Sequence, residues 1–192
     1  MSKKFLTREL IVSAAFHMID ENGTDRFSVR QLASKLGVQV SSLYNHINNE
    51  YDLMLEVAKL AAAMYEEKID VVVEGLTPEE SLFKGAEVFC DFVNEHEFLY
   101  DLLLDRRLIG DPEFEKVNCV FTKPIYYYIE KFNIKDKTAR NHAYVALRVF
   151  THGFASLDAL GLFDGLSTDP KESYLLIANT VLDFMKNLSE KE

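Results

Sequence analysis

Apolar positions recur at helical spacing along nearly the whole chain, and the breaks between these stretches define the predicted elements. Leu10, Ala14 and His17 lie three to four positions apart, which indicates one face of a helix. Thr7 before them is a capping residue and Gly23 after them a stop, so a helix is predicted over about 7–22. The same reasoning predicts an all-α fold, with further helices over about 28–36, 39–46, 97–108, 112–132, 136–160 and 170–188, and long helices that start near residues 50 and 78.

Turn-forming residues are scarce, which favours long helices over a β-sandwich or barrel. The chain of 192 residues has only 8 Gly and 4 Pro. Thr77, Pro78 and Glu80 have the spacing of a capping box with proline at the first helical position. Pro124 falls inside the helix predicted over 112–132, and we expect it to kink or interrupt that helix.

The second and third predicted helices have the residue pattern expected of a helix-turn-helix. Ala33 stands where the two helices must cross closely, and Gly37 can adopt the positive φ that a short turn requires. Val38 and Leu43 are placed to hold the third helix against the second. The third helix is therefore predicted to have one side buried and the other free.

The free side of the third helix is polar throughout. It carries Gln39, Ser41, Ser42, Tyr44, Asn45 and His46. A helix of about eight residues spans roughly 12 Å, close to the width of the major groove of B-DNA. Gln and Asn can bind base edges, Ser can bind bases or phosphates, and Tyr and His suit phosphate oxygens. The alternative is a solvated surface helix, but the apolar residues that fix so short a helix favour contact with DNA.

The charge is distributed unevenly along the chain. The net charge is −10, but residues 1–50 carry six Lys or Arg and five Asp or Glu, a balance of +1. The remaining residues then carry −11. The N-terminal region, which includes Lys3 and Lys4, is therefore able to approach phosphates, whereas an acidic body would oppose wrapping by DNA.

Residues 5–60 resemble the DNA-binding domain of the tetracycline-repressor (TetR/AcrR) family of transcription regulators. The resemblance is carried by "TRELIVSAAFHMIDENG" and "FSVRQLASKLGVQVSSLYNHINNEYDL", and above all by Leu32-Ala33 and Leu36-Gly37-Val38 ahead of Leu43-Tyr44-x-His46. It implies a three-helix DNA-binding head and a larger helical bundle that binds a ligand and forms a dimer. The predicted division is a DNA-binding domain of residues 1–50 and an effector-binding and dimerisation domain of residues 51–192.

The resemblance assigns roles to residues of the head. Tyr44 and His46 match positions that contact phosphate, and Thr7 and Ser28 match helix starts near the DNA backbone. The candidate base readers are Arg30, Gln39, Ser41, Ser42 and Asn45. Glu50 stands where the family commonly has Lys, so one phosphate contact is in doubt and non-specific DNA affinity is expected to be lower than usual.

The second half of the chain carries two less specific sets of candidates. With 14 Phe and 9 Tyr the chain could line a pocket, for which the candidates are Phe89, Phe92, Leu103, Phe121, Tyr127, Tyr144 and His152; ordinary core packing is the alternative for each. Regular 4-3-4-3 spacing in the last two helices suggests a four-helix dimer interface, with burial inside one subunit as the alternative. The candidates for that interface are Phe150, Gly153, Leu157, Tyr174, Ala178, Val181 and Met185.

A subgroup of the same family is also similar to this half. Its "HGF..L" signature corresponds to His152, Gly153, Phe154 and Leu157, although the Trp that many of its members carry nearby is absent from this chain.

The sequence also lacks the motifs that would predict several other classes of protein. It has no catalytic motif, no set of metal ligands and no apolar signal or membrane segment, so we expect a cytoplasmic protein that is not an enzyme and needs neither cofactor nor metal. Cys90 and Cys119 lie within apolar helical patterns and read as free thiols. The predicted function is a homodimeric repressor that releases operator DNA when a small, largely apolar effector binds. The alternatives are a helical protein-interaction module and a DNA-binding regulator without an effector.

Overall fold

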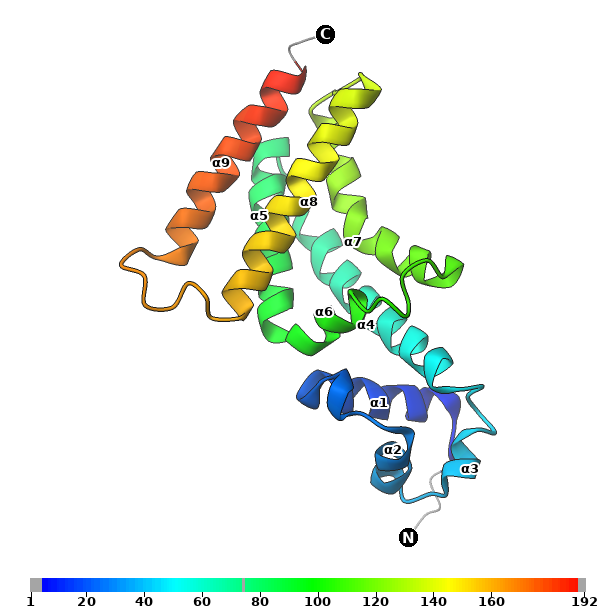
Figure 1. The fold of residues 1–192 in the computed structure, drawn as a ribbon. Coiled ribbons are helices and arrows are strands. Elements are labelled where there is room, and N and C mark those ends of the chain that lie inside the picture. Colours follow the sequence, from blue (N-terminus) through cyan, green and yellow to red (C-terminus); the bar gives the residue numbers. More distant parts are fainter. Residues whose placement is uncertain (1–4, 74, 190–192) are drawn as a thin grey trace. The chain divides into compact units, whose positions relative to one another are not determined.

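The computed structural model describes residues 5–73 and 75–189, and within these ranges all regular structure is helical (Figure 1). The helices form two compact units. The first unit contains the described residues up to Met64 together with His96–Asn118. The second contains Tyr65–Glu95 and the described residues from Cys119 onward.

The first unit is built on α1 (Arg8–Asn22), the short 3₁₀ helix η1 (Thr24–Arg26), α2 (Val29–Leu36) and α3 (Val40–Leu43). The predicted starts and stops of α1 and α2 are confirmed. Thr7 Oγ1 accepts a hydrogen bond from the Leu10 amide, and Ser28 Oγ accepts one from the Gln31 amide, both at 3.2 Å. Gly37 ends α2 in the left-handed conformation (φ 68°, ψ 32°), which a residue with a side chain rarely adopts.

The third helix is shorter than predicted. Its regular α-helical part is Val40–Leu43, and residues 44–46 continue as a turn in which the His46 amide bonds to the Leu43 carbonyl at 2.9 Å. Four residues make barely one helical turn, so the segment depends on packing rather than on its own hydrogen bonds. Leu43 and Ile47, 0% and 2% exposed, provide that packing.

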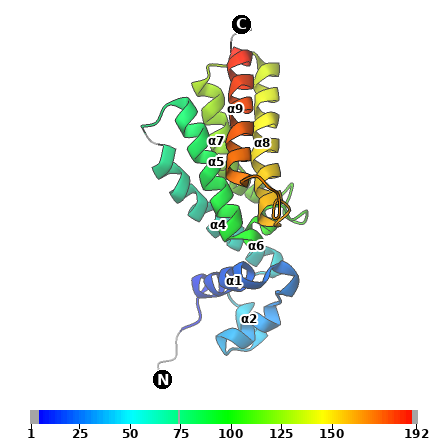
Figure 2. The ribbon, with the colours of Figure 1, turned by 90° about the vertical axis from the view of Figure 1, so that its left-hand side faces the viewer.

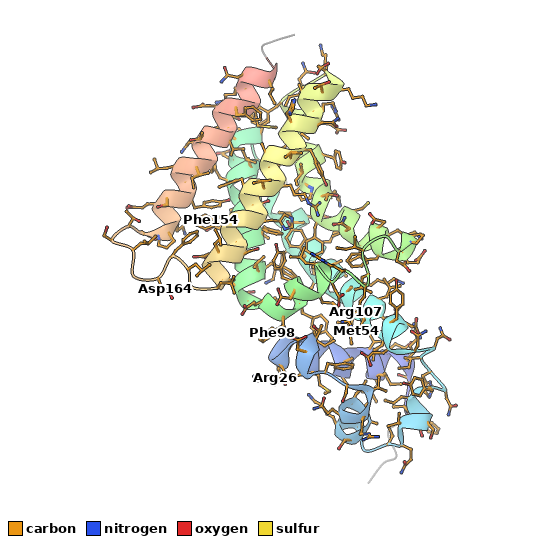
Figure 3. All side chains as sticks on the ribbon, viewed as in Figure 1. Arg26, Met54, Phe98, Arg107, Phe154 and Asp164 are labelled. Atoms are coloured by element: carbon orange, nitrogen blue, oxygen red, sulfur yellow. The ribbon has the colours of Figure 1, made fainter. Side chains whose placement is uncertain are left out.

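The first unit also contains the N-terminal part of α4 (Glu50–Val73), all of α6 (Glu97–Leu103) and the start of α7 (Pro112–Lys131). α6 packs against α1: His96 Nδ1 lies 2.9 Å from Asp20 Oδ1, and Phe98, labelled in Figure 3, covers Gly23. A Cβ at Gly23 would lie 3.1 Å from the Phe98 ring, which is a tight contact, and the φ of 79° at Gly23 also favours glycine. α6 is also shorter than the predicted 97–108, because turns follow Leu103.

The predicted boundary at residue 50 therefore does not coincide with the boundaries of the compact units. The chain crosses between the units three times, within α4, before α6 and within α7. A sequence-based boundary follows the linear order of motifs and has no means of detecting that α6 returns to α1. The functional division into residues 1–50 and 51–192 stays a prediction.

The second unit consists of the rest of α4, α5 (Pro78–Glu95), the rest of α7, α8 (Lys137–Ala159) and α9 (Pro170–Ser189). α8 packs against both α5 and α9, and Figure 2 shows these three helices running side by side. Thr77 and Glu80 form the predicted capping box, since Glu80 accepts from the Thr77 amide at 2.9 Å and Thr77 Oγ1 accepts from the Glu80 amide at 3.2 Å. α7 continues through Pro124, so Pro124 does not interrupt the helix, and the predicted kink stays a prediction.

Four of the seven residues predicted for the dimer interface lie in the interior of the second unit instead. Phe150, Tyr174, Ala178 and Met185 are at most 8% exposed within the single chain, and the Phe150 and Tyr174 rings stack at 5.1 Å. The regular stripe of these two helices is therefore their inward face, packed on α5, rather than a seam between subunits. Val181 is half-buried beside the same core, whereas Gly153 and Leu157 lie on the exposed side of α8.

Candidate nucleic-acid interface

The segment that follows Gly37 presents its polar side chains to solvent. Gln39, Ser41, Tyr44 and Asn45 are exposed, and Ser42 and His46 are half-buried. On the opposite side, Leu43 is fully buried and α3 packs against α2, whose Ala33 is 2% exposed. The segment is thus held by its apolar side, and the six residues predicted to contact DNA form the rest of its surface.

Three further predicted DNA contacts lie at the starts of α1 and α2. The hydroxyl of Thr7 is engaged in capping α1. The hydroxyl of Ser28 caps α2 and also donates to Gln31 Oε1 at 3.0 Å. Arg30 is exposed in the first turn of α2. A helix N-terminus stabilises a nearby phosphate through its free amides, so these capped starts are suited to contact a DNA backbone.

Arg8 connects the recognition segment to α4, a contact that sequence reasoning missed. Its guanidinium donates two hydrogen bonds to the Asp52 carboxylate, at 2.9 and 3.0 Å, and a third to the His46 carbonyl at 2.9 Å. This fork-shaped contact lowers the pKa of Asp52, chiefly through the hydrogen bonds from Arg8. The Asp52 carboxylate also accepts from the Asn48 amide at 3.0 Å, so the turn after α3 is held at both of its ends.

Three further basic residues, in η1 and α2, are exposed, and one of them has an acidic neighbour. Arg26 and Arg30 are exposed, and Lys35 lies 3.9 Å from Glu21, too far for a close ion pair. Lys3 and Lys4, which contribute to the local charge of the sequence, lie outside the described residues. Glu50, which stands where the family commonly has Lys, is exposed at the first turn of α4.

The seven predicted ligand contacts do not come together. Phe89, Phe121 and His152 line a cavity of only about 20 Å³, and Phe92 is fully buried beside Phe121. Tyr127 and Tyr144 pack against a neighbouring core cluster without lining this cavity, and Leu103 belongs to the first unit. The aromatic residues that were predicted to line a ligand pocket are mostly packed in the hydrophobic core of the second unit.

Among these predicted contacts, His152 has a pKa that its surroundings shift strongly. Its ring lies 4.8 Å from that of Phe89, edge to face. Burial lowers the pKa of His152 to about 4, and the nearby charge of Arg148 contributes in the same direction. The imidazole is therefore neutral at physiological pH, as expected for a histidine in a packed interior.

A larger cavity of about 510 Å³ lies elsewhere in the second unit, between α5, the end of α8 and the start of α9. None of the seven predicted residues lines it. Its walls come from three helices and from positions far apart in the sequence, so no local pattern could have indicated it.

Within residues 5–73 and 75–189, no three His, Cys, Asp or Glu side chains are grouped as metal ligands would be. No helix in the same ranges has the length and apolar character needed to span a membrane.

A capped helix-turn-helix with an exposed polar recognition segment, joined to a helical bundle, defines the class of DNA-binding transcription regulators. Comparisons with known proteins agree. The profile described as "Bacterial regulatory proteins, tetR family" matches residues 11–57. The uncharacterised HTH-type transcriptional regulator YobS of Bacillus subtilis is 31% identical over 166 residues, which cover 83% of this chain and 82% of YobS. The chain belongs to the tetR family of bacterial regulatory proteins, which are DNA-binding regulators and not enzymes.

Solved structures share the fold at low sequence identity. The regulator SCO7222, a TetR from Streptomyces coelicolor, superposes with a TM-score of 0.72 and 19% identity, over 96% of this chain and 100% of that one. A TetR variant from Acinetobacter baumannii, solved in complex with minocycline, superposes with a TM-score of 0.68 and 17% identity, over 96% of this chain and 99% of that one. These likenesses establish the all-helical fold with a helix-turn-helix and a larger helical part.

Proposed function

We propose that this regulator is a homodimeric repressor that binds a near-palindromic operator and releases it when a small, largely apolar effector binds the second unit. The observation that supports DNA binding most directly is the exposed polar side of residues 39–46, held from behind by Leu43. Two such segments, about 34–36 Å apart in a dimer, would enter successive major grooves. A regulator with this task works in the cytoplasm, where the chromosome lies.

The proposal of a dimer rests on an apolar face that the described chain leaves uncovered. On α8, Val149 is 68% and Leu157 42% exposed, with Gly153 between them. On α9, Leu176 is 71% and Phe184 38% exposed, two turns apart on one side. Exposed apolar surface of this extent is characteristic of an interface, and two helices from each of two copies would bury it in a four-helix bundle with two-fold symmetry.

The proposed release of DNA follows from the path of the chain. α4 begins beside the recognition segment, where Asp52 binds Arg8, and continues into the second unit. A ligand that binds the second unit and shifts α4 would change the separation of the two recognition segments, so a coupling of about 1–3 kcal/mol would lower operator affinity by roughly 5- to 150-fold. The Acinetobacter baumannii TetR variant with the same fold was solved in complex with minocycline, which supports a ligand-binding role for this protein.

We expect the purified protein to bind a site upstream of its own coding region. The test is a gel-shift titration against that region, with unlabelled specific and random DNA as competitors. Specific binding that survives excess random DNA would support the proposal. Binding that random DNA removes equally well at low salt would eliminate operator recognition and favour the helical protein-interaction module.

We expect the double substitution Val149→Glu and Leu176→Glu to convert the dimer into a folded monomer, because it would bury like charges against one another at the interface. Light scattering coupled to size exclusion measures the mass, and circular dichroism checks that the helices remain. Ile109→Glu, at another exposed apolar position (57%), is the matched control and should leave the mass unchanged. A double variant that stays dimeric would place the interface elsewhere.

A further inference from the structure

The cavity of about 510 Å³ in the second unit has the size of a small-molecule site. It opens between α5, the last turns of α8 and the first turns of α9. Figure 3 labels Phe154 at this place on α8, on the side that faces α9. All of its lining residues belong to the second unit, so the cavity is complete within that unit.

One wall of the cavity is aromatic. Phe83 from α5, Phe154 from α8 and Tyr174 from α9 all line it, and the rings of Phe154 and Tyr174 meet edge to face at 4.9 Å. Cys90 lies beside them, and burial raises the pKa of its thiol to about 12, so the thiol stays neutral. This wall can hold a flat or branched apolar body, and its ring faces attract cations.

The Tyr174 hydroxyl is a polar group without a partner in this wall. The residue is only 6% exposed, and its Oη makes no hydrogen bond with any described residue. A buried hydroxyl without a partner destabilises a protein, so natural structures rarely retain one unless a ligand or water completes it. The Tyr174 ring therefore lines the cavity, whereas its hydroxyl oxygen has no appreciable exposed surface and lies behind the aromatic wall.

The charges around the cavity favour a cation. Its lining contains four carboxylates and two ammonium groups, a net charge of −2. The two lysines, Lys84 and Lys171, both pair with Glu87. Among the described residues Asp91 forms no direct ion pair, although its charge helps to raise the pKa of Lys84, and Asp158 accepts only a neutral amide, Asn94 Nδ2 at 3.0 Å. Two carboxylates, one on α5 and one on α8, are therefore left to face an incoming charge.

We infer that this cavity binds an organic cation with an aromatic or branched apolar body, whose positive charge lies against Asp91 and Asp158 and whose body packs on Phe83 and Phe154. This assignment deepens the proposed function, on which it rests, by naming the site and the chemical class of the effector. An organic anion is disfavoured, because the carboxylates of the lining outnumber its ammonium groups by two.

The test uses the full-length protein without DNA and two shape-matched probe pairs. Tetraphenylphosphonium and rhodamine 6G are the cations, and tetraphenylborate and fluorescein are their anionic counterparts. Isothermal titration calorimetry should detect saturable binding of at least one cation and weaker binding of its anionic counterpart. The double substitution Asp91→Asn and Asp158→Asn should lower the affinity for the bound cation by about tenfold. This is the size expected for the loss of two partly exposed carboxylate contacts.

The control removes the same amount of charge elsewhere in the second unit. Glu67 and Glu130 are exposed and do not line the cavity, so Glu67→Gln with Glu130→Gln should leave cation affinity within about twofold of the parent, as expected for distant screened charges. If neither cation binds, or if the Asp91 and Asp158 variant binds as tightly as the parent, the assignment is wrong.

DNA release separates this inference from the proposed function. If a cation binds through Asp91 and Asp158 but operator affinity stays unchanged, the cavity assignment holds and the repressor switch fails. If a ligand releases the operator equally well from the parent and from the Asp91 and Asp158 variant, the switch holds and the cavity assignment fails.

Discussion

Replacement of both Gln39 and Asn45 by alanine is expected to lower operator affinity by about 30-fold or more, because each side chain that bonds a base edge contributes about 1–3 kcal/mol of discrimination. Both side chains are exposed on the segment after Gly37, and neither is needed to hold that segment in place. The fold of the first unit should therefore be unchanged, and the loss should be confined to specific DNA.

The measurement is a fluorescence-anisotropy titration with the operator and with a scrambled duplex of equal length. Ser13→Ala is the control: this exposed residue lies on α1, away from the recognition segment in sequence, and should bind like the parent. Affinity for the scrambled duplex, which depends mainly on phosphate contacts, should fall much less in the double variant. Equal losses on both duplexes would mean that Gln39 and Asn45 do not read bases.

Leu43→Ala is expected to destabilise the first unit by about 2–5 kcal/mol, the usual range for truncation of a fully buried leucine. Leu43 is the one residue of α3 that is fully buried, and the rest of that short helix has little stability of its own. Operator affinity should fall as well, because the polar side chains would no longer be held in one arrangement.

Urea unfolding followed by circular dichroism measures the first effect and anisotropy the second. Leu60→Ala is the matched control, since Leu60 is 42% exposed on α4. Its truncation should lower the free energy of unfolding by much less than truncation of Leu43 does. The pair of head variants is diagnostic: the Gln39 and Asn45 variant should lose binding without losing stability, whereas Leu43→Ala should lose both. A stable Leu43→Ala protein with normal binding would show that the segment is held by other contacts.

Local chemistry could be predicted from the sequence with good accuracy. Thr7, Ser28 and Gly37 act within three or four residues of their own positions, and each takes the predicted cap or turn. The length of α3 was overestimated because the polar residues after Leu43 are compatible with either helix or turn. In the structure the His46 and Ile47 amides both bond to the Leu43 carbonyl, and the segment ends as a turn. The spacing of apolar residues does not predict these two hydrogen bonds.

Contacts between distant parts of the chain were the ones that sequence reasoning missed. Arg8 and Asp52 lie 44 positions apart, and neither has a neighbour that marks it as a partner. The periodic stripe with Phe150 and Tyr174 was interpreted as a possible dimer seam, yet α5 covers it within one chain. Periodicity identifies which residues share a face of a helix, but it does not reveal what packs on that face.

The return of α6 to α1 has a consequence for protein engineering. A hybrid regulator could be assembled by joining the N-terminal part of one chain to the C-terminal part of another at a single junction. Here such a graft would leave Asp20 and Gly23 without His96 and Phe98, since those partners come from the middle of the chain. A working chimera would need to transplant residues 96–118 together with the N-terminal segment, as one discontinuous module.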